Sequence, residues 1–336
     1  MKKRKLFQIK DLKTFFHTEA GTVKAVNNVS FDINEGEVLG IVGESGSGKS
    51  VTSLSINRLI PNPPGEIVSG QILYDGKDLL KLSYDEMRKY RGRHISMIFQ
   101  EPMTSLNPVM RVSTQMNEVL TNHYGLSFNE ATKKSVDMLD LVGIPDPDRR
   151  INDYPHQFSG GMRQRIMIAM ALQCNPALLI ADEPTTALDV TIQAQILDLM
   201  MEMKIKRKEA AILLITHDLA VIAETCDRVI VMYGGVIQEI ADVYELFRNP
   251  INPYTRALMD SIPRMNQNEK RLKALKGMVP SILELGDECK LCSRFDGVNC
   301  ACGGTKIEPE LVEVGNEHFA RINRDILKNA KKKYNS

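Results

Sequence analysis

The chain has 336 residues, 43% of them hydrophobic and 25% charged, with 22 glycines and 15 prolines. This ordinary globular composition excludes a collagen-like, coiled-coil or largely disordered protein. The 43 Lys and Arg residues against 42 Asp and Glu residues leave a net charge of +1, so no global field recruits nucleic acid or acidic lipid. Because six cysteines are too few for a disulfide-stapled domain, and no signal-peptide core or membrane-spanning apolar run is present, we expect a soluble, cytosolic protein.

Residues 1–250 alternate predicted strands and helices, which is the pattern of an α/β domain. In chain order we predict strands over 7–15, 29–33 and 38–42, a helix over 50–59, a strand over 177–181, a helix over 192–208 and a strand over 211–215. The runs at 177–181 and 211–215 are short, bounded and rich in Leu, Ile and Ala. They are typical of strands that are buried on both faces of a parallel sheet.

Residues 102–173 differ from this pattern, because they contain few β-branched runs and three helical stretches, over 112–123, 129–142 and 161–173. We interpret this region as a helical subdomain inserted into the sheet domain. After residue 250 the alternation fades, and four clustered cysteines follow. We therefore predict a main domain over 1–250 and a small C-terminal extension over 251–336.

Residues 43–50 fit the pattern G-x-x-x-x-G-K-[ST], with a predicted strand before them and a helix after them. Glycines let successive backbone N–H groups turn inward around phosphate oxygens, and the helix directs its positive end at the same charge. Lys49 can reach the β- and γ-phosphates, and the Ser50 hydroxyl can ligate Mg²⁺. A chance glycine-rich turn is the alternative, which the flanking elements disfavour. The predicted nucleotide contacts are Gly43, Ser45, Gly46, Ser47, Gly48, Lys49, Ser50 and Val51.

Two adjacent carboxylates, Asp182 and Glu183, end the strand over 177–181, where ligands of parallel sheets bind. We expect Asp182 to hold Mg²⁺, through water, and Glu183 to orient and deprotonate the attacking water. His217 follows the next buried strand and is expected at the same edge, where an imidazole can contact the γ-phosphate. An isolated acidic pair or a lone histidine would more often be solvated or structural. Beside a phosphate loop, the catalytic interpretation is favoured.

Ser159, Gly160 and Gly161 open a predicted helix, and small residues with exposed N–H groups at a helix N-terminus form an anion site. Alone, this tripeptide would usually be a flexible turn. Within Phe-Ser-Gly-Gly-Met-Arg-Gln-Arg (158–165), it resembles the signature motif of ATP-binding-cassette (ABC) ATPases. The resemblance covers residues 6–250 and implies an α/β P-loop fold, with a RecA-like core sheet, an antiparallel β subdomain and a helical subdomain.

The resemblance to ABC ATPases also assigns roles to other positions. It implies that Phe16, or Phe15 beside it, stacks on adenine, and that Gln100 is the Q-loop glutamine, which contributes to catalysis and to Mg²⁺ binding. Asp189 matches the D-loop and His217 the switch histidine. The phosphate loop and acidic strand of one subunit would bind ATP·Mg²⁺, and residues 159–161 of a second subunit would close on the same γ-phosphate. ATP would thus join two subunits, and its hydrolysis would release them.

Finer features resemble the ATPases of oligopeptide and dipeptide importers. They are residues 98–108, 158–165, 252–258 and 277–281. The resemblance implies an ATP-hydrolysing, energy-coupling subunit, bound peripherally to the cytoplasmic side of the cell membrane. Its expected partners are two transmembrane permease subunits, a second homologous ATPase in a heterodimer, and, indirectly, an extracytoplasmic substrate-binding protein, with no nucleic acid.

Two alternatives to a peptide importer remain open. Nickel and oligosaccharide importers share much of the same pattern, so the same role with either cargo is the nearer one. A soluble ABC ATPase outside transport is disfavoured, because such chains typically carry two cassettes or a long coiled coil between the motifs.

Cys289, Cys292, Cys300 and Cys302 form a C-x2-C-x7-C-x-C cluster, and soft thiolates select zinc or iron–sulfur. Some ATPases of peptide importers carry a [4Fe–4S] cluster here, so the resemblance favours iron–sulfur, with a structural role. In that family the fourth cysteine often follows a histidine in the position of His318, whereas no cysteine follows Cys302 here. Zinc and free thiols remain alternatives, and disulfides are disfavoured in a reducing cytosol. The isolated Cys174 and Cys226 are expected to be packing residues.

Overall fold

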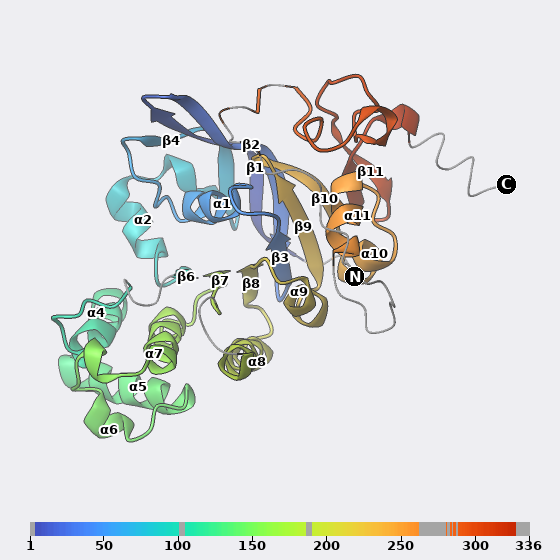
Figure 1. Cartoon of the computed structure of the whole chain (residues 1–336). Helices are drawn as coiled ribbons and strands as arrows, with labels where there is room; N and C mark the ends of the chain where they lie inside the picture. The colour runs from blue at the N-terminus through green and yellow to red at the C-terminus, as the bar shows by residue number, and fades with distance from the viewer. Residues whose placement is uncertain are drawn as a thin grey trace. The chain divides into compact units, whose positions relative to one another are not determined.

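The computed structural model describes residues 4–100, 105–185, 190–261, 280, 283, 285–286 and 288–326 (Figure 1). The chain divides into two compact units. Unit 1 comprises residues 1–7, 33–37 and 74–215, and unit 2 comprises residues 8–32, 38–73 and 216–336. The predicted boundary at residue 250 stays a prediction. Asp189, the predicted D-loop residue, lies outside the described residues.

Three parallel strands form the sheet of unit 1. They are β6 (Ile95–Ile98), β7 (Leu178–Asp182) and β8 (Ala211–Ile215). Ile95 lies opposite Leu178, and Leu178 lies opposite Ala211. All residues of the three strands are buried, which explains why the sequence shows continuous apolar runs instead of alternation. The strands predicted over 177–181 and 211–215 are confirmed.

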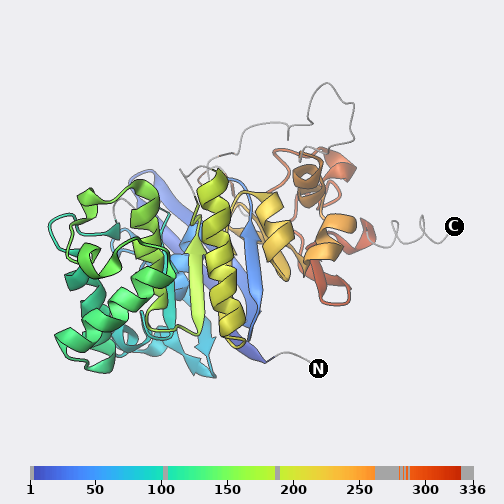
Figure 2. The ribbon, with the colours of Figure 1, turned by 90° about the horizontal axis from the view of Figure 1, so that it is seen from below.

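The helix α8 (Val190–Lys206) lies between β7 and β8 in the chain and confirms the helix predicted over 192–208. Parallel strands need such a crossover, because a tight turn cannot join them. Figure 2 shows α8 alongside the strands of unit 1. Met200 of α8 shares a small cavity with Leu179 of β7 and Ile212 of β8, so the helix packs on the sheet.

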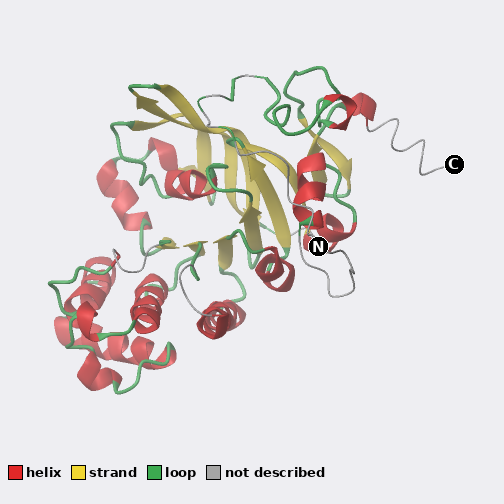
Figure 3. Cartoon of the chain, in the orientation of Figure 1, coloured by secondary structure: helices red, strands yellow, loops and turns green. Residues whose placement is uncertain are grey.

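The predicted helical subdomain is present in unit 1, and Figure 3 shows its helices in red. It contains α4 (Val112–Tyr124), α5 (Phe128–Leu141), α6 (Pro147–Arg150) and α7 (Gly160–Leu172). A capping box between Ser127 and Glu130 begins α5. Cys174 packs with Leu120 and Ala131 in a buried cluster, as expected of a packing residue. Among the described residues, no helix has both the length and the apolar character needed to cross a membrane.

Unit 2 contains most of one sheet and the whole of a second ladder. The first sheet has the strand order β2 (Gly21–Asn34), β1 (Lys5–Thr18), β4 (Gly65–Tyr74) and the two-residue β5 (Lys77–Asp78). The second ladder comprises β3 (Val38–Val42), β9 (Arg228–Tyr233), β10 (Val236–Asp242), β12 (His318–Arg321) and β11 (Leu311–Gly315). Strand β9 runs parallel to β3, and the remaining neighbours pair antiparallel. The strands predicted over 7–15, 29–33 and 38–42 are confirmed, the first two being longer than predicted.

The C-terminal extension adds structure that the sequence did not predict. After α10 (Val243–Arg248) and α11 (Pro253–Asp260), the strands β11 and β12 extend the ladder of unit 2. Ala320 of β12 lies opposite Glu239 of β10. The buried Glu239 carboxylate also accepts hydrogen bonds from His318 Nε2 at 2.7 Å and from the Asn252 backbone N–H at 2.9 Å. These two short segments are strands because β12 pairs with both β10 and β11.

Candidate functional site

The phosphate loop lies in unit 2 between β3 and α1 (Lys49–Ile56), as the motif predicts. Gly43 and Gly48 have φ values of 151° and 100°. A Cβ atom at Gly43 would lie 2.2 Å from the Met232 carbonyl oxygen, and one at Gly48 would lie 2.4 Å from that of Ala25. Both positions therefore require glycine, for conformation and for space.

Lys49 reaches back over the phosphate loop. Its Nζ donates to the carbonyl oxygens of Gly43 at 2.7 Å and Glu44 at 3.0 Å, and the residue is only 6% exposed. The ammonium group thus lies above the loop whose backbone N–H groups are expected to bind phosphate. Phosphate oxygens are stronger acceptors for an ammonium group than neutral carbonyls, so a bound nucleotide would attract this side chain.

In unit 1 the structure brings together two of the predicted catalytic residues. Gln100 Nε2 donates to Glu183 Oε2 at 3.0 Å. Asp182, the last residue of β7, is buried at 4% exposure. Glu183 has a φ of 46°, and its backbone N–H donates to the Ile215 carbonyl oxygen at 2.8 Å. This left-handed conformation is uncommon outside glycine and asparagine, and it turns the chain sharply as it leaves the strand.

The residue before His217 is tied to the strand that enters the phosphate loop. The Thr216 backbone N–H donates to the Ile41 carbonyl oxygen at 3.3 Å, within unit 2. After His217, Asp218 caps α9 (Leu219–Thr225) by accepting from the Ala220 backbone N–H. His217 is exposed and lies at the carboxyl end of β8, where the sequence predicts it.

The signature segment of unit 1 begins a helix with an open end. Ser159 caps α7, and its Oγ accepts from the Met162 backbone N–H at 3.3 Å. Gly160 is exposed, and a Cβ atom there would meet nothing within 4 Å. The first turn of α7 thus has open space beside Gly160, where the predicted contact with a second subunit would form.

The predicted adenine-stacking residue, Phe16, lies in β1 and is half-buried. A Cβ atom at Gly65 would lie 2.8 Å from Phe16 Cε1, so the ring packs against the start of β4. Phe15 beside it is likewise half-buried. Burial alone does not separate the two, and the adenine contact stays a prediction.

The four clustered cysteines form a compact set of sulfur atoms. The Sγ atoms of Cys289, Cys292, Cys300 and Cys302 all lie within 4.8 Å of one another, and none is in a disulfide. The separations are 3.6 Å for Cys289–Cys300, 3.7 Å for Cys292–Cys300 and 3.4 Å for Cys292–Cys302. Four thiolates around one tetrahedral zinc ion would lie roughly 3.8 Å apart, given a Zn–S bond of about 2.3 Å. The donor set therefore fits a metal centre.

Neighbouring thiols favour a negative charge within this cluster. Hydrogen bonding from Cys289 lowers the pKa of the Cys300 thiol to about 5, although burial opposes the shift. The same contact, followed by burial, raises the pKa of Cys289. A thiolate that accepts hydrogen bonds from neighbouring thiols favours metal binding, because cysteine binds metals as the thiolate.

The segment downstream of His318 returns to the cysteine cluster. The Asn323 backbone N–H donates to the Ala301 carbonyl oxygen at 2.8 Å, and Asn323 Nδ2 donates to that of Cys302 at 3.2 Å. A ligand placed after His318 would thus arrive beside Cys302. In the resembling family, the fourth cysteine follows the position of His318. Because the segment after His318 lies beside Cys302, Cys302 can take the place of that fourth cysteine.

The structure shows a contact between the extension and the phosphate loop that sequence motifs do not indicate. Arg294, between the second and third cysteines, pairs with Glu44 of the loop at 2.6 Å. Tyr254 of α11 accepts a hydrogen bond from the Glu44 backbone N–H at 3.1 Å. All three residues belong to unit 2.

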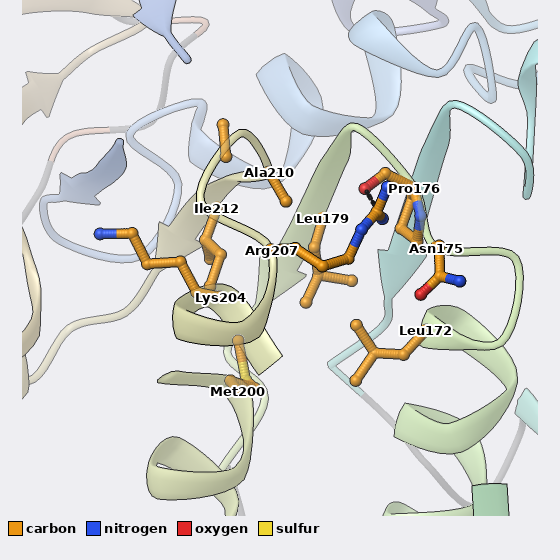
Figure 4. A pocket seen from close by; sticks show the side chains of 10 residues that line it. Leu172, Asn175, Pro176, Leu179, Met200, Lys204, Arg207, Ala210 and Ile212 are labelled. Carbon is orange, nitrogen blue, oxygen red and sulfur yellow. Dashed lines mark hydrogen bonds between the residues drawn. The ribbon is translucent and has the colours of Figure 1, made fainter. Parts of the chain in front are cut away.

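Figure 4 shows a separate cavity in unit 1, of about 20 Å³, between the end of α7 and the strands β7 and β8. Arg207 closes one side of it by donating to the Pro176 carbonyl oxygen at 2.9 Å. This volume holds about one water molecule, so the cavity is a packing defect and not a ligand site.

Comparison with known proteins identifies two matching families. Residues 26–186 match the family described as ABC transporter, and residues 238–302 match the family described as oligopeptide/dipeptide transporter, C-terminal region. The chain is 54% identical over 290 residues to a probable peptide ABC transporter ATP-binding protein of Sinorhizobium fredii, covering 86% of each chain. It is 50% identical to the oligopeptide transport ATP-binding protein OppD of Bacillus subtilis, covering 94% of this chain and 88% of the relative.

Two solved structures share the fold. The dimeric, post-hydrolysis ATP-binding cassette MJ0796 bound to ADP and Pi aligns with a TM-score of 0.63 at 28% identity, over 70% of this chain and 98% of that one. The protein cbiO1 of Clostridium perfringens, part of the ABC transporter complex cbiONQ, aligns with a TM-score of 0.60 at 28% identity, over 73% of this chain and 92% of that one. The predicted α/β P-loop cassette is therefore confirmed.

Proposed function

Because this chain belongs to the family of ABC transporter ATP-binding proteins, we propose that it is the ATP-hydrolysing subunit that supplies energy to a peptide importer. The observation that carries the catalytic part is the hydrogen bond between Gln100 and Glu183, which places the expected Q-loop glutamine beside the carboxylate that is expected to activate water. The peptide cargo rests on the match of residues 238–302 and on the names of the relatives. The same role in a nickel or oligosaccharide importer remains the alternative.

In the proposed site, Lys49 exchanges the carbonyl oxygens of Gly43 and Glu44 for the β- and γ-phosphate oxygens of ATP. The backbone N–H groups of residues 45–51 bind the remaining phosphate oxygens. Ser50, Gln100 and Asp182 are the residues that would hold Mg²⁺, and their oxygen atoms are the kind of ligand that this ion prefers. The ion supplies neutralisation of charge on the phosphates.

Glu183 orients the attacking water and accepts its proton, and Gln100 holds the carboxylate in place through the 3.0 Å hydrogen bond. His217 contacts the γ-phosphate. The open end of α7, with Ser159, Gly160 and Gly161, binds the γ-phosphate held by a partner subunit. Asp189 is expected at the same subunit boundary.

We infer an assembly of this chain with a second homologous ATPase and two transmembrane permease subunits, at the cytoplasmic side of the membrane. An extracytoplasmic binding protein would deliver the cargo. Tagging the chain, solubilising native membranes gently and identifying the co-purifying proteins tests this assembly. We expect two polytopic subunits and a distinct, similar ATPase. Ribosomal or DNA-bound partners without membrane proteins would discard transport and leave the ATPase assignment standing.

We further propose that the four cysteines bind a metal centre that stabilises the extension. The resemblance to peptide-importer ATPases favours [4Fe–4S], whereas the separations of 3.4–3.7 Å between Cys289 and Cys300, Cys292 and Cys300, and Cys292 and Cys302 suit a single zinc ion. Thiolates on a four-iron cluster bind different iron atoms and lie farther apart, so that occupant would require the loops to separate.

Anaerobic purification followed by iron, sulfide and zinc analysis distinguishes the occupants. We expect about four iron and four sulfide per chain for the cluster, with loss of the metal in Cys300→Ser and retention in the matched control Cys174→Ser. A content of one zinc per chain would show that the cysteines form a zinc site and not an iron–sulfur cluster. Absence of any metal from the anaerobic wild-type protein would discard the metal centre.

A further inference from the structure

Two residues of the extension, Arg294 and Tyr254, contact Glu44 of the phosphate loop. Arg294 binds its carboxylate at 2.6 Å, and Tyr254 accepts from its backbone N–H at 3.1 Å. Tyr254 is fully buried at 0% exposure, and its ring lies 4.8 Å from the Tyr233 ring. The contact between Glu44 and the extension thus involves groups that are packed and buried.

In this charged pair, the arginine side chain is almost fully buried, whereas the glutamate side chain is partly exposed. The Arg294 side chain is 2% exposed, against 27% for Glu44. Arg294 Cζ also lies 6.0 Å from the centre of the Tyr233 ring, within the range of a cation–π contact. Breaking a buried ion pair by removing one partner is costly, because the other charge is left uncompensated.

Glu44 also organises the inside of the loop. Its carbonyl oxygen accepts from Lys49 Nζ at 3.0 Å and from the Ser47 backbone N–H at 3.2 Å. Its own N–H is directed to Tyr254, away from the N–H groups that follow it in the loop. Its carboxylate would repel the phosphates of a nucleotide if Arg294 did not neutralise it.

We propose that Arg294 is a positioning residue for nucleotide binding, which acts through Glu44 and makes the affinity of the phosphate loop depend on the fold of the cysteine-bearing segment. The proposal rests on the nucleotide site described above. It extends that site by a residue 250 positions away in the chain. A loosened segment around residues 288–302 would release Glu44 and weaken the binding of nucleotide.

The test is a double-mutant cycle on the full-length chain, with the affinity for MgADP measured by calorimetry. We expect Arg294→Gln to weaken binding about tenfold, which is within the range of coupling found for contacting charges. The double variant Arg294→Gln with Glu44→Gln should recover most of that loss, because both charges are then removed together. Arg294→Lys, which keeps the charge without the planar fork, should be intermediate.

The matched control is Arg324→Gln, which breaks an exposed pair with Glu310 in the same extension and should leave the affinity unchanged. The variant Lys49→Ala distinguishes a failure of this proposal from a failure of the proposed nucleotide site. If Lys49→Ala binds MgADP as the wild type does, the nucleotide site itself is wrong. If Lys49→Ala loses binding while Arg294→Gln does not, or if the Arg294 and Glu44 effects simply add, the proposed link is wrong.

Hydrogen exchange on the wild-type protein gives a second test that needs no variant. Because coupling between sites is reciprocal, MgADP should slow amide exchange in residues 288–302 as well as in residues 43–50. Protection confined to the phosphate loop would overturn the proposal.

Discussion

Glu183→Gln is expected to reduce the steady-state ATPase rate of the assembled transporter at least ~100-fold, while MgATP affinity stays within about threefold of the wild type. Glutamine has nearly the shape of glutamate, and its carbonyl oxygen can still accept from Gln100 Nε2, which now donates to Glu183 at 3.0 Å. What the variant loses is the carboxylate that takes a proton from the attacking water. The variant should therefore keep MgATP binding and lose most of its ATP hydrolysis.

Radiolabelled phosphate release and equilibrium nucleotide binding measure the two quantities. The exposed Glu202 of α8 provides a matched control, since Glu202→Gln makes the same chemical change in unit 1 away from the acidic strand end. Gln100→Ala should slow turnover less than Glu183→Gln, because it removes the group that orients the carboxylate and leaves the carboxylate in place. Unchanged ATPase activity in the Glu183→Gln complex would overturn the assignment of the general base.

Lys49→Ala is expected to weaken nucleotide binding itself, by about 10- to 100-fold. Lys49 is 6% exposed, and its ammonium group already lies over the loop, held by the carbonyl oxygens of Gly43 and Glu44. A charge placed in advance at the phosphate position loses little further freedom when nucleotide binds. Its removal takes away charge-assisted hydrogen bonds that no neighbouring side chain of the motif replaces.

Calorimetric titration with MgADP checks this prediction without interference from hydrolysis. Lys10→Ala, at an exposed position of β1, removes the same charge from unit 2 and should bind normally. A thermal melt of the variant without nucleotide distinguishes loss of affinity from loss of fold. Wild-type affinity in a folded Lys49→Ala protein would contradict the proposed role of the loop.

The two variants should thus fail in opposite ways. Glu183→Gln is expected to hold ATP and to stabilise the ATP-joined pair of subunits, whereas Lys49→Ala should never form that pair. Size-exclusion chromatography of the complex with MgATP would separate these outcomes.

The sequence alone determined those parts of this protein whose conformation depends on the residues of one short segment. The phosphate loop is one, because the positive φ angles, the absent Cβ atoms and the lysine all lie within residues 43–50. The strands β7 and β8 are another, since burial on both faces gives an unbroken apolar run. The helices α4, α5 and α7 were predicted within one residue at each end, because helical sequence patterns are local signals.

Only the tertiary structure decided the contacts between segments far apart in the chain. The partners Gln100 and Glu183 are separated by 83 residues, and Glu44 and Arg294 by 250. No local pattern records such a pairing, because each side chain taken alone is an ordinary polar residue. The strand β12 forms by pairing with β10 and with β11, and Cys302 lies beside the segment after His318 because that segment folds back. The sequence specifies the individual motifs through local chemistry, and long-range packing determines which of them act on one another.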